Sequence, residues 1–304
     1  MFRGTPVWGV LAAAALLTGC SSSQATAPTV VATTTILGDI TQQITACTGG
    51  TSVTLMPNGT DPHDFAASSQ QIALMDDAEL VVANGLGLEA GLTDALASAS
   101  ADGAHVLEVG AHLNPLPFNG STTTPDPHVW FDMERMAAAA ELIGSTLADT
   151  TAHPDYRECG QQVADRIRAA DTQVRAVLES VPEGKRVLIT DHDAFGYLAA
   201  RYGYRIAGSV VPSSSTLAEP SSADLAALAA EVRRQGVPAI FSNVGQPGAL
   251  ASAVASEAGT HVTVVPLYVE SLGAPGTSAD SYIGMMMYDA TAIADALNQT
   301  GDTP

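Results

Sequence analysis

Positively charged residues are scarce in this sequence. The 304 residues include 12 Lys and Arg against 32 Asp and Glu, which gives a formal net charge of −20 at pH 7. Proteins that bind nucleic acid or anionic membrane surfaces carry basic patches, so this composition argues against both kinds of partner. The sequence also lacks a G-x-x-x-x-G-K-[ST] motif, the phosphate-binding loop of many nucleotide hydrolases. Any nucleotide-driven step would therefore have to come from another protein.

Long apolar runs are also absent, except near the N-terminus. Residues 7–17 are mostly apolar, follow Arg3 and lead into Leu-Thr-Gly-Cys, which ends at Cys20. This run is too short for a transmembrane helix, which needs about 20 apolar residues, but it has the length of a signal-peptide core. The Leu-Thr-Gly-Cys sequence resembles a bacterial lipobox, in which the Cys is lipidated and becomes the first residue of the mature protein. We therefore predict a lipoprotein signal peptide over residues 1–19, lipidation of Cys20 and a flexible tether over residues 20–28. A plain secretory signal is the alternative.

Cysteine is rare too, with three residues in the sequence. Once Cys20 is lipidated, Cys47 and Cys159 remain, and an even pair in an exported protein can form a disulfide. Two free, buried thiols are the alternative. We expect the disulfide because both residues lie in polar sequence surroundings. Neither has the close Cys or His spacing of a structural zinc site.

Short β-rich runs alternate with helical patterns along the rest of the chain. Four expected strands precede residue 110 and four follow residue 185. They cover residues 29–35, 52–56, 80–84 and 105–109 in the first group, and residues 186–191, 205–211, 239–243 and 261–267 in the second. This alternation predicts parallel sheets that are covered by helices.

A long helical pattern separates the two groups of strands. Its last part begins near Pro154, which suits a first helical turn, and stops near Pro182. Apolar residues recur there at spacings of three and four, namely Val163, Ile167, Ala170, Val174 and Val177. We therefore predict an α/β fold with two lobes, residues 29–152 and 184–304, each a four-stranded, mainly parallel sheet with flanking helices. A long rigid helix over residues 153–183 joins them.

The tripeptide Asp-Pro-His occurs twice, in "TDPHDF" (residues 60–65) and in "PDPHVWFD" (residues 125–132). Proline restricts its own backbone and that of the preceding residue, which helps to aim the following imidazole at a fixed point. A third His ends the fifth expected strand, and an Asp follows the eighth. The candidate ligands are His63, His128, His192 and Asp280. All four lie downstream of the carboxyl ends of strands, the edge at which open parallel sheets bind ligands. Three imidazoles and a carboxylate suit zinc well and make manganese possible.

Several segments together carry a family resemblance. They are "LMPNGTDPHDF", "NGLGLE", "DPHVWFD", "HDAFGYLAARYGY", "AEPSSADL", "ESLG" and "ADSYIGMMMYD". In this order they resemble the cluster A-I (class III) solute-binding lipoproteins of zinc and manganese ABC transporters, over nearly the whole mature chain. The resemblance implies the same four ligands and two α/β lobes joined by a rigid helix. Manganese members usually have Glu where this chain has His192, which favours zinc. Many zinc members carry a His-rich loop before the second ligand, and here "NPLPFNGSTTTPDP" has no His.

The resemblance implies a receptor anchored by the lipid on Cys20 at the outer face of the bacterial cytoplasmic membrane. We expect a monomer that captures Zn²⁺ in the cleft between its lobes and delivers it to an ABC permease and its cytoplasmic ATPase. Four protein ligands leave no open position for a reactive water, so we expect a binding protein and no enzyme. A manganese receptor is the main alternative, followed by a metal-stabilised adhesin or a metallohydrolase with Asp280 as general base.

Four other carboxylates near these motifs are candidates for supporting the ligands. Asp191 and Asp193 flank His192 and could orient ligands, although exposure or helix capping would explain them equally well. Glu219 and Glu270 could serve similarly. The remaining histidines lack such contexts and are expected to be structural or exposed, namely His105, His112, His153 and His261.

Overall fold

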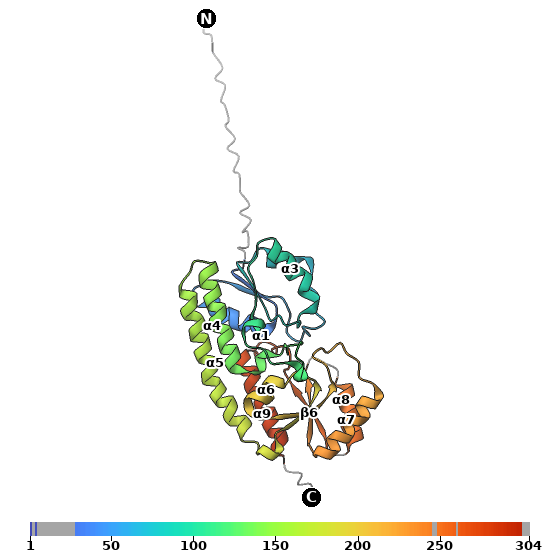
Figure 1. The fold of residues 1–304 in the computed structure, drawn as a ribbon. Coiled ribbons are helices and arrows are strands. Elements are labelled where there is room, and N and C mark those ends of the chain that lie inside the picture. Colours follow the sequence, from blue (N-terminus) through green and yellow to red (C-terminus); the bar gives the residue numbers. More distant parts are fainter. Residues whose placement is uncertain (2–3, 5–27, 245–247, 260, 300–304) are drawn as a thin grey trace.

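The computed structural model describes residues 28–244, 248–259 and 261–299, together with Met1 and Gly4. Cys20 and nearly all of the predicted signal peptide and tether lie outside the described residues. Within the described part of the chain, no helix has the length and hydropathy needed to cross a membrane. Figure 1 shows two lobes, with one long helix running along one side of both and a second, shorter helix beside its upper part.

The N-terminal lobe contains a parallel sheet with the strand order β2-β1-β3-β4. Its strands are β1 (Val30–Ala32), β2 (Ser52–Thr54), β3 (Leu80–Ala83) and β4 (Val106–Glu108). The central strands β1 and β3 read VVA and LVVA and are fully buried, as expected for a parallel sheet covered on both faces. Helix α1 (Thr35–Ala46) covers one face, and α2 (Ser69–Asp76) and α3 (Thr93–Ala101) cover the other.

The C-terminal lobe repeats this arrangement with the strand order β6-β5-β7-β8, again parallel throughout. Its strands are β5 (Val187–His192), β6 (Arg205–Val211), β7 (Ala239–Asn243) and β8 (Thr263–Leu267). Its helices are α6 (Gly196–Tyr202), α7 (Ser222–Gln235), α8 (Ala249–Ala258) and α9 (Tyr282–Asn298). Side chains alternate along β5: Val187 and Ile189 pack with α7 and α8, whereas Leu188 joins the core shared with α9.

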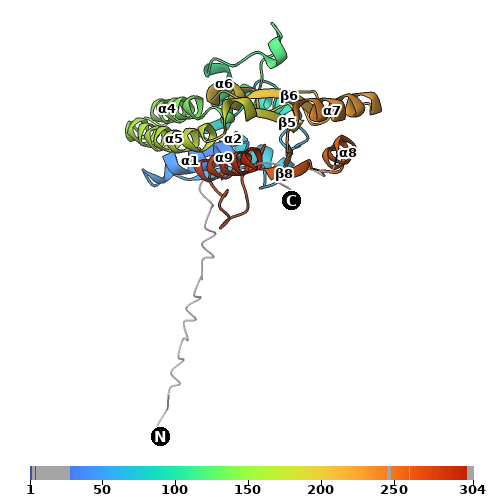
Figure 2. The same ribbon diagram turned by 90° about the horizontal axis from the view of Figure 1, so that it is seen from below.

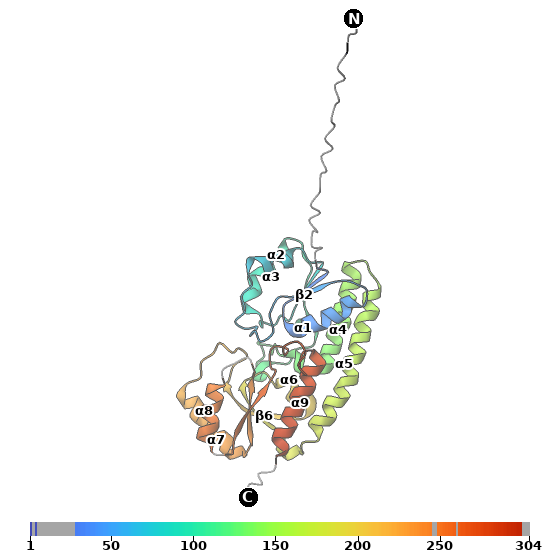
Figure 3. The same cartoon turned by 180° about the vertical axis from the view of Figure 1, so that it is seen from behind.

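Two antiparallel helices, α4 (Met133–Thr150) and α5 (Asp155–Glu179), connect the lobes. The Asp132 carboxylate caps α4 by accepting hydrogen bonds from the backbone N–H groups of Glu134 and Arg135. The helices approach closely at Gly144 and Gly160, where an added Cβ on Gly160 would lie 2.6 Å from the carbonyl oxygen of Ala140. The 25 residues of α5 span about 37 Å. Figures 1 and 3 both show α5 passing beside α1 of one lobe and α9 of the other.

Short 3₁₀ helices fill several connections. They are η1 (Ala90–Leu92), η2 (Val109–His112), η3 (Phe118–Gly120), η4 (Val129–Phe131) and η5 (Glu183–Lys185). Figure 2 shows α4 and α5 together at one edge of the molecule, with α7 and α8 at the opposite edge. The predicted fold class is therefore confirmed: two four-stranded parallel sheets with flanking helices, joined by a long helix.

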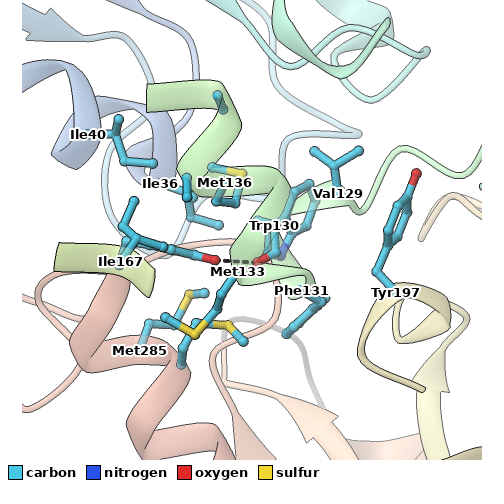
Figure 4. Packing of buried hydrophobic residues seen from close by; sticks show 14 of the residues in the cluster. Ile36, Ile40, Val129, Trp130, Phe131, Met133, Met136, Ile167, Tyr197 and Met285 are labelled. Carbon is cyan, nitrogen blue, oxygen red and sulfur yellow. Dashed lines mark hydrogen bonds between the residues drawn. The ribbon is translucent and has the colours of Figure 1, made fainter. Parts of the chain in front are cut away.

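One hydrophobic core runs through both lobes and the connecting helices. Figure 4 shows Ile36 of α1, Trp130 of η4, Ile167 of α5 and Met285 of α9 packed together. The Trp130 side chain donates a hydrogen bond from Nε1 to the carbonyl oxygen of Val269 (2.8 Å). A wide separation of the lobes would expose this shared core to water, at a cost of roughly 25 cal/mol per Å² of apolar surface.

A disulfide joins Cys47, the C-cap of α1, to Cys159 in the second turn of α5. The two Cα atoms are 6.0 Å apart, and 112 positions separate the two residues in sequence. The expected bridge is therefore present, and it fastens the N-terminal lobe to the connecting helix.

Candidate metal centre

Four buried side chains converge between the lobes, each at the carboxyl end of a strand or in the segment beyond it. His63 follows β2, His128 directly precedes η4, His192 is the last residue of β5, and Glu270 follows β8. Each offers one ligand atom, and these four atoms all lie within 4.8 Å of one another. Their relative exposures lie between 0% and 4%. The space among them suits a single ion better than an organic molecule.

The atoms that face the centre are short of hydrogen-bond partners. Oε1 of Glu270 lies 3.1 Å from Nε2 of His63, 2.8 Å from Nε2 of His192 and 3.8 Å from Nε2 of His128. Within the described ranges, Nε2 of His128, Nε2 of His192 and Oε2 of Glu270 make no hydrogen bond of acceptable geometry. Buried polar atoms are nearly always hydrogen-bonded, so three that lack a well-formed hydrogen bond around one point indicate a place for a cation.

Aspartates contact the Nδ1 atoms of two of the imidazoles, on the side that faces away from the centre. Oδ1 of Asp126 lies 2.7 Å from Nδ1 of His128, and Oδ1 of Asp191 lies 3.2 Å from Nδ1 of His192. A carboxylate in this position accepts Nδ1–H, so the lone pair of a neutral imidazole is left on Nε2, toward the centre. The expected supporting role of Asp191 therefore has a geometric basis, and Asp126 is a second such residue that the sequence analysis did not single out.

The repeated Asp-Pro-His sequence has a shared local geometry. The carboxylates of Asp61 and Asp126 accept hydrogen bonds from the backbone N–H groups of His63 (2.9 Å) and His128 (3.0 Å), two residues along the chain. Asp favours this turn because its side chain reaches the backbone two residues on. The intervening Pro has no N–H of its own that could compete. Each motif therefore presents a His from a fixed turn.

Burial and neighbouring charges shift the pKa values of three of the four clustered residues. Burial lowers the pKa of His128 and so favours its neutral form. Burial also lowers the pKa of His192, but the hydrogen bond with Asp191 and the negative charges of Glu270 and Asp191 outweigh this and raise the pKa to about 10. Burial would raise the pKa of Glu270, but the neighbouring His192 and His63 hold it well below its usual range. A metal cation bound here would take the place of the proton on His192.

Asp280 lies apart from this cluster. It is exposed, and its carboxylate accepts a hydrogen bond from the backbone N–H of Gly276 (2.9 Å), in the turn that precedes α9. The structure thus brings together His63, His128 and His192 of the expected set with Glu270, and Asp280 lies outside this group. Strand β8 ends at Leu267, close to Glu270 and much farther along the chain from Asp280.

The other candidates are not among the four convergent residues. Asp193 is buried, and burial raises the pKa of its carboxyl group. Glu219 is exposed. The four histidines that were expected to be structural or exposed are all exposed, namely His105, His112, His153 and His261.

Among the described residues, two sizeable cavities can be compared with the cluster, and both lie outside it. One of about 320 Å³ lies between the lobes beside the Glu270 segment, and Gly59, Ser271 and Leu272 contribute to its walls. A larger one of about 820 Å³ lies at the opposite edge of the C-terminal sheet and includes Val187 and Thr263, the first residues of β5 and β8. None of the four clustered residues lines it, so its size does not make it the metal site.

Residues 30–296 match the family model described as zinc-uptake complex component A, periplasmic. The chain belongs to this family. It is 30% identical over 254 residues to the zinc-binding protein TroA of Treponema pallidum, covering 80% of each chain. It is also 30% identical over 304 residues to the manganese-binding lipoprotein MntA of Bacillus subtilis, covering 95% of this chain and 97% of that one. The solved structure of Treponema pallidum TroA superposes with a TM-score of 0.79 at 28% identity, covering 90% of this chain and 99% of that one. These matches confirm the family resemblance carried by the sequence motifs.

Proposed function

We propose that the protein is an extracytoplasmic receptor that captures a divalent transition metal between its lobes and delivers it to an ABC permease with a cytoplasmic ATPase. The observation that carries this proposal is the convergence of three imidazoles and a carboxylate whose inward-facing atoms are buried, three of them without a well-formed hydrogen bond among the described residues. The names of the relatives support it, since they include zinc-binding and manganese-binding proteins and metal ABC transporter lipoproteins.

We assign metal binding to His63, His128, His192 and Glu270, with Glu270 in place of Asp280. A nearly fully buried carboxylate among three imidazoles is poised to accept a cation, whereas an exposed Asp280 would have to leave its own turn to do so. Asp126 and Asp191 would keep the rings of His128 and His192 in the ligating tautomer.

Zinc is the metal that this ligand set favours. Three imidazole nitrogens and one carboxylate oxygen without a thiolate match a closed four-coordinate zinc site, and such a site has no position left for a reactive water. This supports binding over catalysis. Manganese is the second candidate, because carboxylate ligands suit it and a manganese-binding relative is equally similar in identity.

The remaining features of the proposal come from the sequence. Residues 1–19 would be removed, Cys20 would carry the lipid and hold the receptor at the outer face of the bacterial cytoplasmic membrane, and residues 20–28 would act as its tether. The receptor would act as a monomer. The lobes would comprise residues 29–152 and 184–304, with residues 153–183 as the connection.

The test is a metal titration of the chain from Ser21 onward, stripped of metal, with Zn²⁺ and Mn²⁺ in separate calorimetric experiments. We expect one tight zinc site and much weaker manganese binding. Tight manganese with weak zinc would keep the receptor and replace its metal, whereas the absence of any tight site would refute the proposed function.

A matched pair of variants tests the fourth ligand. Glu270→Gln keeps the size of the side chain but removes its charge, and we expect zinc affinity to fall by more than about 100-fold, beyond the effect typical of a residue that only supports a ligand. Asp280→Asn should stay within about threefold of wild type because this side chain is exposed and outside the cluster. The reverse pattern would restore Asp280 as the ligand.

A further inference from the structure

The four proposed ligands differ in how firmly the fold holds them. His192 ends a central strand, and His128 leads into the buried helix η4. His63, in contrast, lies in the connection between β2 and α2, where the residues form no helix or strand. Because the shared core opposes a wide separation of the lobes, displacement of this segment is the shortest way to open the site. The lifetime of a bound metal should then depend on what holds residues 57–64 in place.

The C-terminal lobe holds this segment from two directions. On one side, the backbone N–H of Gly59 donates to Oγ of Ser271 (2.7 Å), and the amide of Asn58 donates to the carbonyl oxygen of Gly273. On the other side, Oγ1 of Thr216 donates to Oδ2 of Asp61 (2.6 Å). Thr216 lies in the connection between β6 and α7, far from Asp61 in sequence.

The side chain of Asp61 links Thr216 to the backbone of His63. Asp61 uses Oδ2 for the hydroxyl of Thr216 and Oδ1 for the backbone N–H of His63. Thr216 therefore fixes the orientation of the carboxylate that holds the turn presenting His63.

We propose that Thr216 is a positioning residue for His63, and that its hydrogen bond to Asp61 determines how long the metal stays bound. The part that concerns the metal rests on the proposed function. The part that concerns the segment does not, because the hydrogen bonds join protein groups only.

The test compares Thr216→Val with Thr216→Ser, which keeps the hydroxyl, and with Ser214→Ala on the same connection. The Ser214 hydroxyl makes no hydrogen bond with the described residues. The first measurement is hydrogen exchange of the metal-free chain in a peptide covering residues 57–64. We expect faster exchange in Thr216→Val and wild-type rates in the two controls. Unchanged exchange in Thr216→Val would overturn the positioning role.

The second measurement is the dissociation rate of Zn²⁺, followed after mixing the loaded protein with excess chromogenic chelator. We expect Thr216→Val to release zinc about tenfold faster, which corresponds to about 1.4 kcal/mol, with wild-type rates in both controls. A change below twofold, or an equal change in Thr216→Ser, would overturn the claim about metal lifetime. If the wild-type chain binds no zinc, the proposed function fails, whereas the exchange measurement still decides whether Thr216 holds the segment.

Discussion

Reduction of the Cys47–Cys159 disulfide should remove a large part of the stability of this fold. The bridge closes a stretch of 112 positions between the end of α1 and the start of α5. In the chain-entropy description, a loop of this length costs the unfolded state about 16 cal/mol/K, or about 5 kcal/mol at 25 °C. Domains are typically stable by about 5–15 kcal/mol, so this contribution is a substantial fraction of the whole.

The same reasoning predicts that metal binding survives reduction. Helix α1 is 12 residues and thus about 18 Å long. Its first residue, Thr35, contacts the segment after Glu270 through a hydrogen bond from the backbone N–H of Leu272 (2.9 Å), whereas the disulfide lies at its other end. Zinc affinity should therefore change by less than about threefold as long as the reduced protein is folded.

The assay is urea unfolding of the chain from Ser21 onward, oxidised and after reduction by a phosphine, with zinc titrations of both forms. A Cys47→Ser/Cys159→Ala double variant serves as the control, since the reductant should not alter its midpoint. A loss below about 1 kcal/mol on reduction would refute the entropic reasoning. A large loss of zinc affinity in the folded, reduced chain would show that the bridge positions the site.

Two further predictions concern buried charges outside the metal centre. Asp289 is fully buried in α9, one of its oxygens has no partner among the described residues, and burial raises its pKa well above 3.8. When folding raises the pKa of an acid, the free energy of unfolding falls as pH rises from 3.8 toward that pKa, by up to about 1.4 kcal/mol per pH unit. Asp289→Asn should therefore gain stability relative to wild type as pH increases, measured by urea unfolding. A pH-independent difference between the two proteins would contradict this. Arg201 of α6 is paired with Asp171 of the connecting helix and with Asp132, which caps α4. Asp171→Asn should cost about 3 kcal/mol because it leaves a poorly solvated guanidinium without one partner, whereas Asp165→Asn, at an exposed salt bridge, should cost less than about 0.5 kcal/mol in the same assay.

Much of the fold follows from sequence pattern because parallel strands buried on both faces are short runs of apolar, mostly β-branched residues. VVA at residues 30–32 and LVVA at residues 80–83 illustrate this. The edge strand β2 is shorter than its expected range of residues 52–56 because only Ser52–Thr54 pairs with β1. The five 3₁₀ helices had no comparable signal, since each lasts only three or four residues and is fixed by its surroundings.

The histidines of the site could be found from sequence because each one is tied to a local feature. The Asp-Pro-His turns are complete within three residues, and His192 ends a strand that its apolar residues predict. The supporting contact from Asp126 is likewise local, two residues from His128. In contrast, the hydrogen bond from Thr216 to Asp61 joins segments 155 positions apart, and no pattern along the chain signals it.

The fourth ligand shows where a motif and a physical rule diverge. Both Glu270 and Asp280 follow the last strand and lie in segments that carry the family resemblance. The resemblance implies Asp280 as the ligand, whereas the structure gathers Glu270 with the three histidines. The rule that ligands lie just beyond the carboxyl ends of parallel strands favours the nearer residue, because each further position lets the chain turn away from the sheet edge. Glu270 is also flanked by buried Val269 and Ser271, so its own backbone is held in the interior. Asp280 lies beyond a turn at Gly276, directly before the N-cap Ser281 of α9, where exposed carboxylates are common for reasons unrelated to metals. A buried carboxylate needs a positive partner. Glu270 has one in His192, and the proposed metal ion would supply it in the loaded protein.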